Sequence, residues 1–213
     1  YKIKEIEGRV IPSKVGPLLP ITHPAYYWRR PEEFFDFIEC MRVGVRFLDG
    51  VYIQCDTPEW VEVTSENLGQ VKEELSKYEE IGIDIETTGF FAYGWDPCRI
   101  LEVGLAPTGK KAFIVPGEMV EEFKGILEEK RCIFWNAQFD SAFLKVRGIT
   151  PNIYFDGMLA HYSMDERPYS HGLKKVARIH LGADDWGAEV EGWIPKRKTE
   201  TVDFGAVPKE VRY

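Results

Sequence analysis

The chain has 213 residues, of which 44% are hydrophobic, and its 27 basic and 35 acidic residues give a net charge of −8. A chain of this length and composition can bury a sizeable core and should form one full domain plus an appendage, which excludes a disordered tail. The acidic balance argues against a protein that holds nucleic acid through its overall charge, because phosphate contacts supply most of the non-specific affinity.

The cysteines and the apolar runs indicate the cellular compartment of the protein. The four cysteines are far apart and have no paired metal-ligand spacing, which indicates reduced, intracellular thiols. No stretch approaches the length of a membrane span, and no basic-then-apolar leader opens the chain, so a cytoplasmic protein without membrane contact is predicted. A phosphate-binding Gly-rich loop, a G-x-S-x-G elbow and a zinc-type His/Cys cluster are also missing, which argues against NTPases, serine hydrolases and zinc enzymes.

The first fifty residues differ from the rest of the chain. An apolar stretch leads into Thr22-His23-Pro24-Ala25 and then into a helical pattern. This arrangement resembles the C-terminal end of uracil-DNA glycosylases, in which a strand runs into an H-P-S or H-P-A motif and then a helix. The resemblance implies that His23 stands where that family stabilises a leaving base. The family's water-activating acid motif is not in this chain, so we expect residues 1–50 to be a glycosylase-like remnant without activity of its own.

Strands and helices alternate in the remainder, after a stretch of helical spacing over 66–78. Pro107-Thr108-Gly109-Lys110 is typical of a hairpin turn between two strands. A hairpin followed by a strand-helix-strand unit predicts a mixed sheet with helices outside it. The expected strands are 81–86, 100–105, 112–115 and 132–135, and the expected helices are 120–129, 141–146, 158–164 and 173–181.

The first expected strand carries two carboxylates, in the string Ile81-Gly82-Ile83-Asp84-Ile85-Glu86-Thr87-Thr88-Gly89. Side chains two apart on a strand share one face, so the isoleucines would pack on one side while Asp84 and Glu86 project on the other, where Gly82 leaves room. Two adjacent carboxylates repel each other unless a cation lies between them. Because Mg²⁺ prefers oxygen ligands, the pair predicts half of a metal site.

A third acid occurs in Asn136-Ala137-Gln138-Phe139-Asp140, between an apolar run and a helical pattern. Asp140 alone could be an ordinary helix N-cap. A later segment contains Asp156 before a helical stretch and then His171-Gly172-Leu173-Lys174-Lys175-Val176-Ala177. For Asp156 we favour the structural role of a cap over a role in the chemistry.

In their order and contexts, these motifs resemble those of the DEDD-type 3′–5′ exonucleases of RNase H-like fold, in particular the proofreading domain of family A DNA polymerases. DIETTG corresponds to the first motif and NAQFD to the second, and the resemblance covers about 78–213. It implies an α/β fold, an RNase H-like mixed sheet flanked by helices, here with a small N-terminal α/β appendage. The domains expected are therefore 1–50, the glycosylase-like remnant, and 51–213, the exonuclease domain with its third motif truncated.

The resemblance also implies a function, hydrolysis of DNA 3′ ends with two Mg²⁺ or Mn²⁺ ions. Asp84 would bridge both ions, Glu86 would bind the ion that holds the water, and Asp140 would support the second. Thr88, Asn136 and Phe139 would contact a single-stranded DNA 3′ end. The third motif, Tyr-x-x-x-Asp, would arrive at Tyr213, with its Asp beyond this sequence. The setting implied is a bacterial or phage-infected cell, with a polymerase domain C-terminal in the parent protein.

Several alternatives stay open from the sequence alone. The missing fourth acid would suit a nuclease-silent DNA-binding or structural module, and relatives that act on RNA 3′ ends suggest an RNA exonuclease. The aromatic residues in 87–97 could stack unpaired bases or could close the core under a long loop. Two basic patches could contact phosphate or be solvated surface: Lys174, Lys175 and Arg178, and Lys196, Arg197 and Lys198.

Overall fold

The computed structural model describes residues 3–53, 55, 58–94, 97–167 and 171–183. The chain divides into two compact units. One contains the described residues up to 55 together with 167 and 171–183, and the other contains 58–166.

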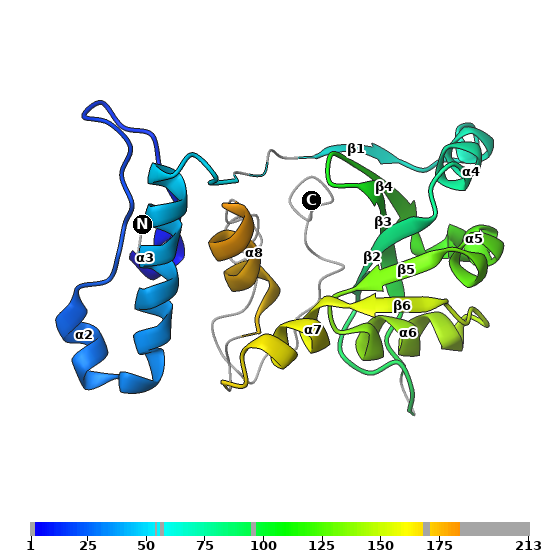
Figure 1. The fold of residues 1–213 in the computed structure, drawn as a ribbon. Coiled ribbons are helices and arrows are strands. Elements are labelled where there is room, and N and C mark those ends of the chain that lie inside the picture. The colour runs from blue at the N-terminus through cyan, green and yellow to red at the C-terminus, as the bar shows by residue number, and fades with distance from the viewer. Residues whose placement is uncertain (1–2, 54, 56–57, 95–96, 168–170, 184–213) are drawn as a thin grey trace. The chain divides into compact units, whose positions relative to one another are not determined.

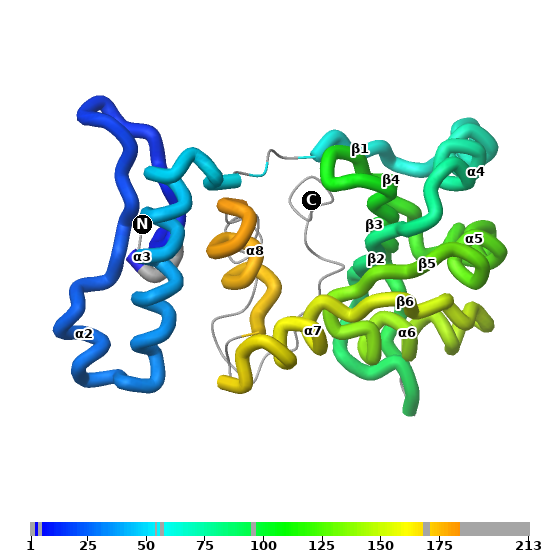
Figure 2. Tube along the Cα trace, in the orientation of Figure 1, coloured from blue at the N-terminus to red at the C-terminus, as the bar shows by residue number. Residues whose placement is uncertain are grey.

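The second unit is built on a six-stranded mixed sheet (Figure 1). Its order is β1-β4-β3-β2-β5-β6, and the tube view follows the same order from one edge to the other (Figure 2). β3 is antiparallel to its two neighbours, β2 and β4, whereas β5 and β6 run parallel to β2, and β1 runs parallel to β4. The strands are β1 (Glu59–Glu62), β2 (Glu80–Thr87), β3 (Ile100–Thr108), β4 (Lys111–Pro116), β5 (Arg131–Phe134) and β6 (Ile153–Asp156).

One face of this sheet carries the core, because its strands alternate between buried apolar and more polar residues. Ile81, Ile83 and Ile85 of β2 are at most 6% exposed, as the alternation in the sequence predicts. Figure 1 shows α4, α5 and α6 along one side of the sheet. The helical elements of this unit are α4 (Leu68–Ser76), the 3₁₀ helix η2 (Gly117–Phe123), α5 (Lys124–Glu129), α6 (Ala137–Val146) and α7 (Gly157–Met164).

The structure confirms the expected mixed α/β sheet, the four expected strands and the hairpin between β3 and β4. It also contains β1 and β6, which the sequence did not predict. Both are edge strands with largely exposed residues, so neither shows the alternation of buried positions that marks a strand in a sequence. The helix expected over 120–129 begins earlier, as η2, and becomes α-helical only at Lys124.

The first unit consists of helices around a small apolar core. Val10, Val43 and Ile179 are buried together, with Leu19 and Tyr52 packed against them. In the described residues before 56, the secondary structure is helical apart from one isolated bridge between Ile11 and Leu18, so the strand expected in an α/β appendage is not seen there. The helices are α1 (Ile3–Ile6), α2 (Pro24–Arg29), the 3₁₀ helix η1 (Pro31–Glu33), α3 (Phe34–Leu48) and α8 (Leu173–Leu181).

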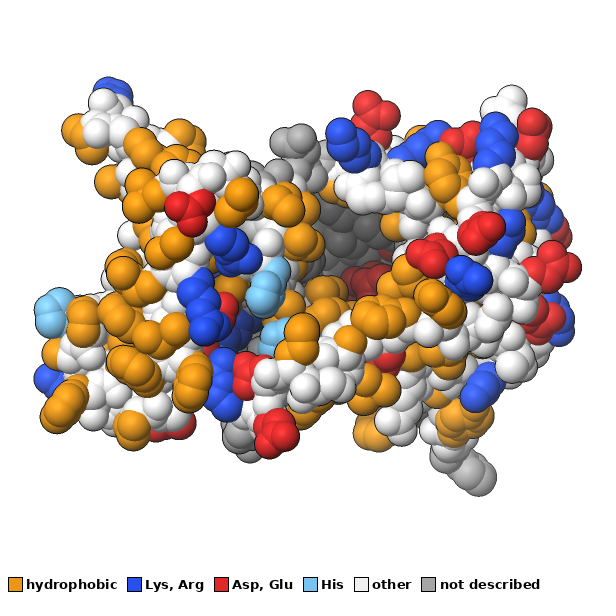
Figure 3. All heavy atoms as spheres, viewed as in Figure 1, with side chains coloured by type: hydrophobic (Ala, Val, Ile, Leu, Met, Phe, Trp, Pro, Cys, Tyr) orange, Lys and Arg blue, Asp and Glu red, His pale blue; other side chains and the backbone are white. Residues whose placement is uncertain are grey.

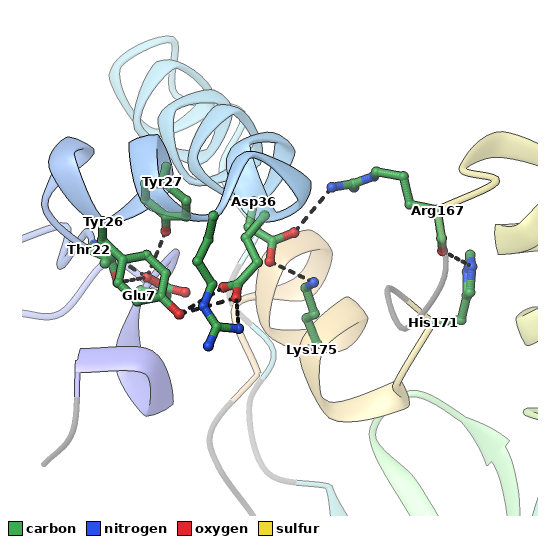
Figure 4. Close-up of polar contacts among 10 residues, drawn as sticks. Glu7, Thr22, Tyr26, Tyr27, Asp36, Arg167, His171 and Lys175 are labelled. Carbon is green, nitrogen blue, oxygen red and sulfur yellow. Dashed lines mark hydrogen bonds and ion pairs between the residues drawn. The ribbon is translucent and has the colours of Figure 1, made fainter.

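Two buried carboxylates organise the polar contacts of this unit (Figure 4). Glu7 accepts hydrogen bonds from the amide and hydroxyl of Thr22 and from the Tyr27 hydroxyl. Asp36 on α3 forms ion pairs with Arg167 at 3.4 Å and with the Lys175 ammonium at 2.8 Å. α8, which the family resemblance places in the exonuclease region, is therefore held by α3 through the pair of Lys175 and Asp36.

The opposite face of α3 carries apolar side chains at the surface. Phe34, Met41, Val45 and Leu48 are each at least 44% exposed, and their spacing places them along one side of the helix. Figure 3 shows hydrophobic side chains gathered over α2 and α3. No helix in the described part of the chain is long and apolar enough to cross a membrane.

The Asp36 contacts predict how α8 is held. Replacing Asp36 with Ala leaves two basic side chains without their shared carboxylate, and we expect a loss of about 2 kcal/mol of unfolding free energy, as for a hydrogen bond to a charged group. Amide hydrogen exchange in α8 should accelerate, whereas exchange in β2 and β5 should not. Glu39→Gln, which removes an exposed pair with Arg42 on the same helix, is the matched control. Unchanged exchange in α8 of the Asp36→Ala protein would contradict the proposed anchoring.

Candidate functional site

The face of β2 opposite the core carries the predicted acid pair. Asp84 is exposed and Glu86 is half-buried, while their neighbours Ile83 and Ile85 are buried on the other side. The predicted alternation along this strand is therefore confirmed.

Two glycines flank Asp84 on this face, Gly82 on the same strand and Gly104 directly opposite on β3. A Cβ atom added at either glycine would meet no neighbour closer than 3.5 Å, so packing does not require glycine there. The absence of side chains leaves the sheet surface beside Asp84 clear for a ligand.

The strand register adds a carboxylate that the sequence did not single out. Glu102 of β3 lies opposite Glu86, so the two side chains share one face, and Glu102 is only 3% exposed. The register shifts between Glu86 and Thr87, which marks an irregularity where β2 ends. Such bulges commonly lie beside functional sites because they redirect side chains.

Asp140 comes to the same strand from α6. β2 pairs with β5 only over Glu80–Gly82, so later backbone groups of β2 on that side need other partners. Asp140 fills this role: its Oδ1 accepts a hydrogen bond from the Ile85 amide at 3.1 Å, and its side chain is 3% exposed. The fold thus brings Asp140 beside the residue that separates Asp84 from Glu86, as the sequence motifs predict.

The electrostatics of these acids follow from that placement. Burial raises the pKa of Asp140 to about 7, and the nearby charges of Asp84 and Asp156 raise it as well, against the opposing effect of the Ile85 amide. Desolvation by the surrounding protein also raises the pKa of Asp84, although its side chain is accessible to solvent. Charging both groups at once is therefore unfavourable without a cation nearby.

The acids do not form a compact ligand shell by themselves. Among the described residues, no group of three or more His, Cys, Asp or Glu side chains lies close enough together to hold a metal ion. Mutual repulsion opposes closer approach of the carboxylates, and one Asp140 oxygen is engaged by the Ile85 amide.

A cavity of about 500 Å³ lies between α6 and the loop that follows β2. Phe90, Phe91 and Tyr93 of this loop are 73%, 72% and 62% exposed, so they do not close the core. On the α6 side, Phe139 and Phe143 pack with ring centroids 5.1 Å apart. The lining residues are Phe90, Phe91, Ala92, Tyr93, Asn136, Gln138, Phe139, Ala142 and Phe143. The cavity therefore has aromatic rings on both sides, and it includes two predicted substrate-binding residues, Asn136 and Phe139.

Other predicted residues have different places. The Thr88 hydroxyl accepts a hydrogen bond from the Arg99 amide at 2.9 Å, so it stabilises the strand end locally. His23 caps α2, where its Nδ1 accepts from the Ala25 amide at 3.1 Å. Lys175 pairs with Asp36, which reduces its availability to phosphate. Tyr213, Trp95 and the basic patch at 196–198 lie outside the described residues.

Asp156 is confirmed as a helix cap and has a second role that the sequence did not reveal. Its side chain accepts from the Met158 and Leu159 amides at the start of α7. It also accepts from the Asn136 and Ala137 amides at 3.1 and 2.8 Å, at the start of α6. This link depends on β6 pairing beside β5, and β6 itself was not predicted.

Comparison with known families shows to which family the chain belongs. A family model of DNA polymerase A type, described as 3′–5′ exonuclease, matches residues 58–189, more than half of the chain. The chain belongs to this 3′–5′ exonuclease family. Members of this exonuclease superfamily are metal-dependent hydrolases, so the enzyme class expected from the motifs is confirmed.

Solved structures share the exonuclease fold. Trypanosoma brucei RNase D in complex with RNA U12 matches with a TM-score of 0.55 and 18% identity, over 73% of this chain and 57% of that chain. Brucella melitensis NrnC matches with a TM-score of 0.51 and 18% identity, over 74% of this chain and 73% of that chain. The POL domain of Pol1 from M. smegmatis matches with a TM-score of 0.51 and 15% identity, over 59% of this chain and 23% of that chain.

These likenesses have defined limits. The chain spans between 40% and 57% of the RNase D chains that it matches. No curated protein gives a significant match. At these identities, the solved structures establish the fold of the exonuclease unit.

The raised pKa of Asp140 predicts a pH-dependent stability. Because the folded protein holds this proton up to about pH 7, well above the ordinary carboxyl range, Asp140 stabilises the fold at low pH and loses this contribution as pH rises through 7. In EDTA, unfolding free energy should therefore fall as the pH rises from about 4, the ordinary carboxyl pKa, to about 7, by up to about 1.4 kcal/mol for each pKa unit of the shift. Asp140→Asn should remove this part of the slope in denaturant titrations. If the unfolding free energies of wild type and Asp140→Asn change with pH in the same way, the raised pKa of Asp140 is contradicted.

Proposed function

We propose that this exonuclease removes nucleotides one at a time from the 3′ end of single-stranded DNA, with two divalent ions, Mg²⁺ or Mn²⁺. The observation that carries the proposal is the meeting of Asp84 from β2 and Asp140 from α6, two carboxylates that raise the cost of charging one another. The match to a DNA polymerase A type model supports DNA as the substrate.

The donor set suits hard divalent cations, which prefer carboxylate oxygens. Asp84 is accessible and lies beside the bare surface of Gly82 and Gly104, and it would be a ligand to both ions. Glu86 would hold the ion that carries the attacking water, and Asp140 would support the second. When bound, such ions make water a better nucleophile and neutralise charge on the leaving 3′ oxygen.

The residues around the acids would bind and orient the strand. The aromatic cavity offers rings from the loop after β2 and from α6, and base stacking on such rings contributes about 1 to 3 kcal/mol per base. Asn136 and Phe139 line this cavity and would flank the terminal nucleotide. Since stacking is indifferent to base identity, the enzyme should remove all four nucleotides.

RNA is the second candidate substrate. RNase D and NrnC share the fold of this chain, and the structure of RNase D contains RNA U12. We propose DNA first and treat RNA as the competing outcome, because the matching family model is of the polymerase type. We further propose proofreading beside a polymerase domain as the biological role. A nuclease-silent binding module is the third outcome.

The exonuclease assay should use the complete gene product that contains this chain. With Mg²⁺, it should shorten 5′-labelled single-stranded DNA one nucleotide at a time. Asp84→Ala should lower the rate about a thousandfold, because a ligand to catalytic metals contributes several kcal/mol and each 1.36 kcal/mol is tenfold. DNA binding should largely survive, since the aromatic cavity does not depend on Asp84.

Glu80→Gln is the matched control, because Glu80 lies on the same strand and the same alternating face, four residues before Asp84, and is exposed. This variant should keep full activity. Faster shortening of RNA than of DNA would favour the second candidate. A folded wild-type protein that binds single-stranded DNA but releases no nucleotide in Mg²⁺ or Mn²⁺ would decide for the silent module.

A further inference from the structure

One carboxylate that is not among the proposed metal ligands connects the starts of two helices, α6 and α7. Asp156 accepts four backbone hydrogen bonds: Oδ1 from the Asn136, Met158 and Leu159 amides at 3.1, 2.9 and 3.2 Å, and Oδ2 from the Ala137 amide at 2.8 Å. A simple N-cap satisfies amides of its own helix. Asp156 also satisfies the first amides of α6, which begins twenty residues earlier in the chain.

The residue that receives this support has an unusual backbone. Asn136 is left-handed, with φ 70° and ψ 57°, and is the one residue other than glycine with positive φ in the part of the chain that the structure describes. Side chains disfavour this region, although Asn tolerates it better than most residues. The two hydrogen bonds from the Asn136 and Ala137 amides to Asp156 favour this conformation over the alternatives.

The left-handed turn determines where the cavity wall stands. It ends β5 and starts α6, so it sets the position of Asn136, Gln138 and Phe139, which line the cavity. The Phe139 amide donates to the Asn136 carbonyl at 3.0 Å, which carries the geometry of the turn into the helix. Asp156 itself is not among the residues that line the cavity.

Packing reinforces the same junction. α7 begins at Gly157, where an added Cβ would lie 2.7 Å from the ring of Trp135, the residue before Asn136. The Trp135 ring also lies 6.3 Å, centroid to centroid, from the His161 ring of α7. The close approach of α7 to the end of β5 therefore places the Asp156 carboxylate at the left-handed turn.

We propose that Asp156 is a positioning residue, which holds Asn136 in its left-handed conformation and thereby forms the pocket for the terminal nucleoside of the substrate. This inference rests on the proposed function. Loss of Asp156 should weaken binding of the strand end more than it slows turnover at saturating substrate, because Asp84 and Glu86 belong to β2, and Asp140, although on α6, is held separately by the Ile85 amide.

The substitution Asp156→Ser tests the positioning of Asn136 separately from the capping of α7. Serine is as good an N-cap as Asp for α7, but its single, shorter hydroxyl oxygen replaces two carboxylate oxygens and does not bridge to α6. We expect the Asp156→Ser protein to unfold within a few degrees of wild type, with faster hydrogen exchange at the Asn136 and Ala137 amides. Its KM for a single-stranded oligonucleotide, and its Kd for fluorescein-labelled dT₅ in EDTA, should rise about tenfold, with kcat changed much less.

A second variant tests the backbone argument directly. Glycine adopts the left-handed region freely. Asp156→Ser should therefore weaken dT₅ binding much less in an Asn136→Gly background than in wild type, and a double-mutant cycle measures this difference. Glu128→Gln, which alters another carboxylate that accepts a loop amide, from Thr150, is the matched control and should leave KM unchanged. If Asp156→Ser unfolds, Asp156→Asn, which retains the cap and one acceptor oxygen, replaces it in the same cycle.

The outcomes are distinguishable. If the wild-type enzyme is active and Asp156→Ser leaves KM and dT₅ affinity unchanged, the positioning role is overturned. An equal loss of dT₅ affinity in the wild-type and Asn136→Gly backgrounds would overturn it as well. A fall in kcat with KM unchanged would also overturn it. A wild-type protein without nuclease activity would instead count against the proposed function, while the exchange at Asn136 and the dT₅ affinity would still report on the positioning role.

Discussion

The site depends on the approach of two like-charged carboxylates, Asp84 and Asp140, at the end of β2. The fold holds Asp140 there through burial and the Ile85 amide, although burial and the charge of Asp84 raise its pKa to about 7. Burying an uncompensated charge is costly, so the arrangement favours either a shared proton or a cation. The proposed role of this pair as metal ligands agrees with the 3′–5′ exonuclease family to which the chain belongs.

The residues around the two acids support this arrangement. Pairing between β2 and β5 ends at Gly82, so the Ile85 amide beyond it donates to Asp140, and Gly82 and Gly104 keep the sheet clear beside Asp84. The aromatic loop and α6 border a cavity of about 500 Å³, in which we propose that unpaired bases bind. Asp156 holds the turn from which α6 starts. The sheet supplies the acids, and the β5–α6 junction supplies the pocket wall.

The sequence predicted the parts of this site that local patterns encode. Alternation placed Asp84 and Glu86 on one face of a strand, and the NAQFD string placed Asp140 on a helix after a strand. What it could not predict depends on pairing between distant segments: the position of Glu102 opposite Glu86, and the contact of Asp156 with α6 through β6. Exposed edge strands such as β6 have no buried alternation to reveal them. The packing of α8 with α3 likewise involves an ion pair between Lys175 and Asp36, which are 139 residues apart in the chain.

Calorimetric titration with Mn²⁺ at pH 6.5, in two buffers with different ionisation enthalpies, tests the central claim most directly. If a divalent ion replaces the proton that Asp140 holds, binding should release about one proton. Asp140→Asn should bind with less proton release, and Asp84→Ala should lose most of the binding heat. Binding without proton release, or equal Mn²⁺ heats in wild type and Asp84→Ala, would contradict the account.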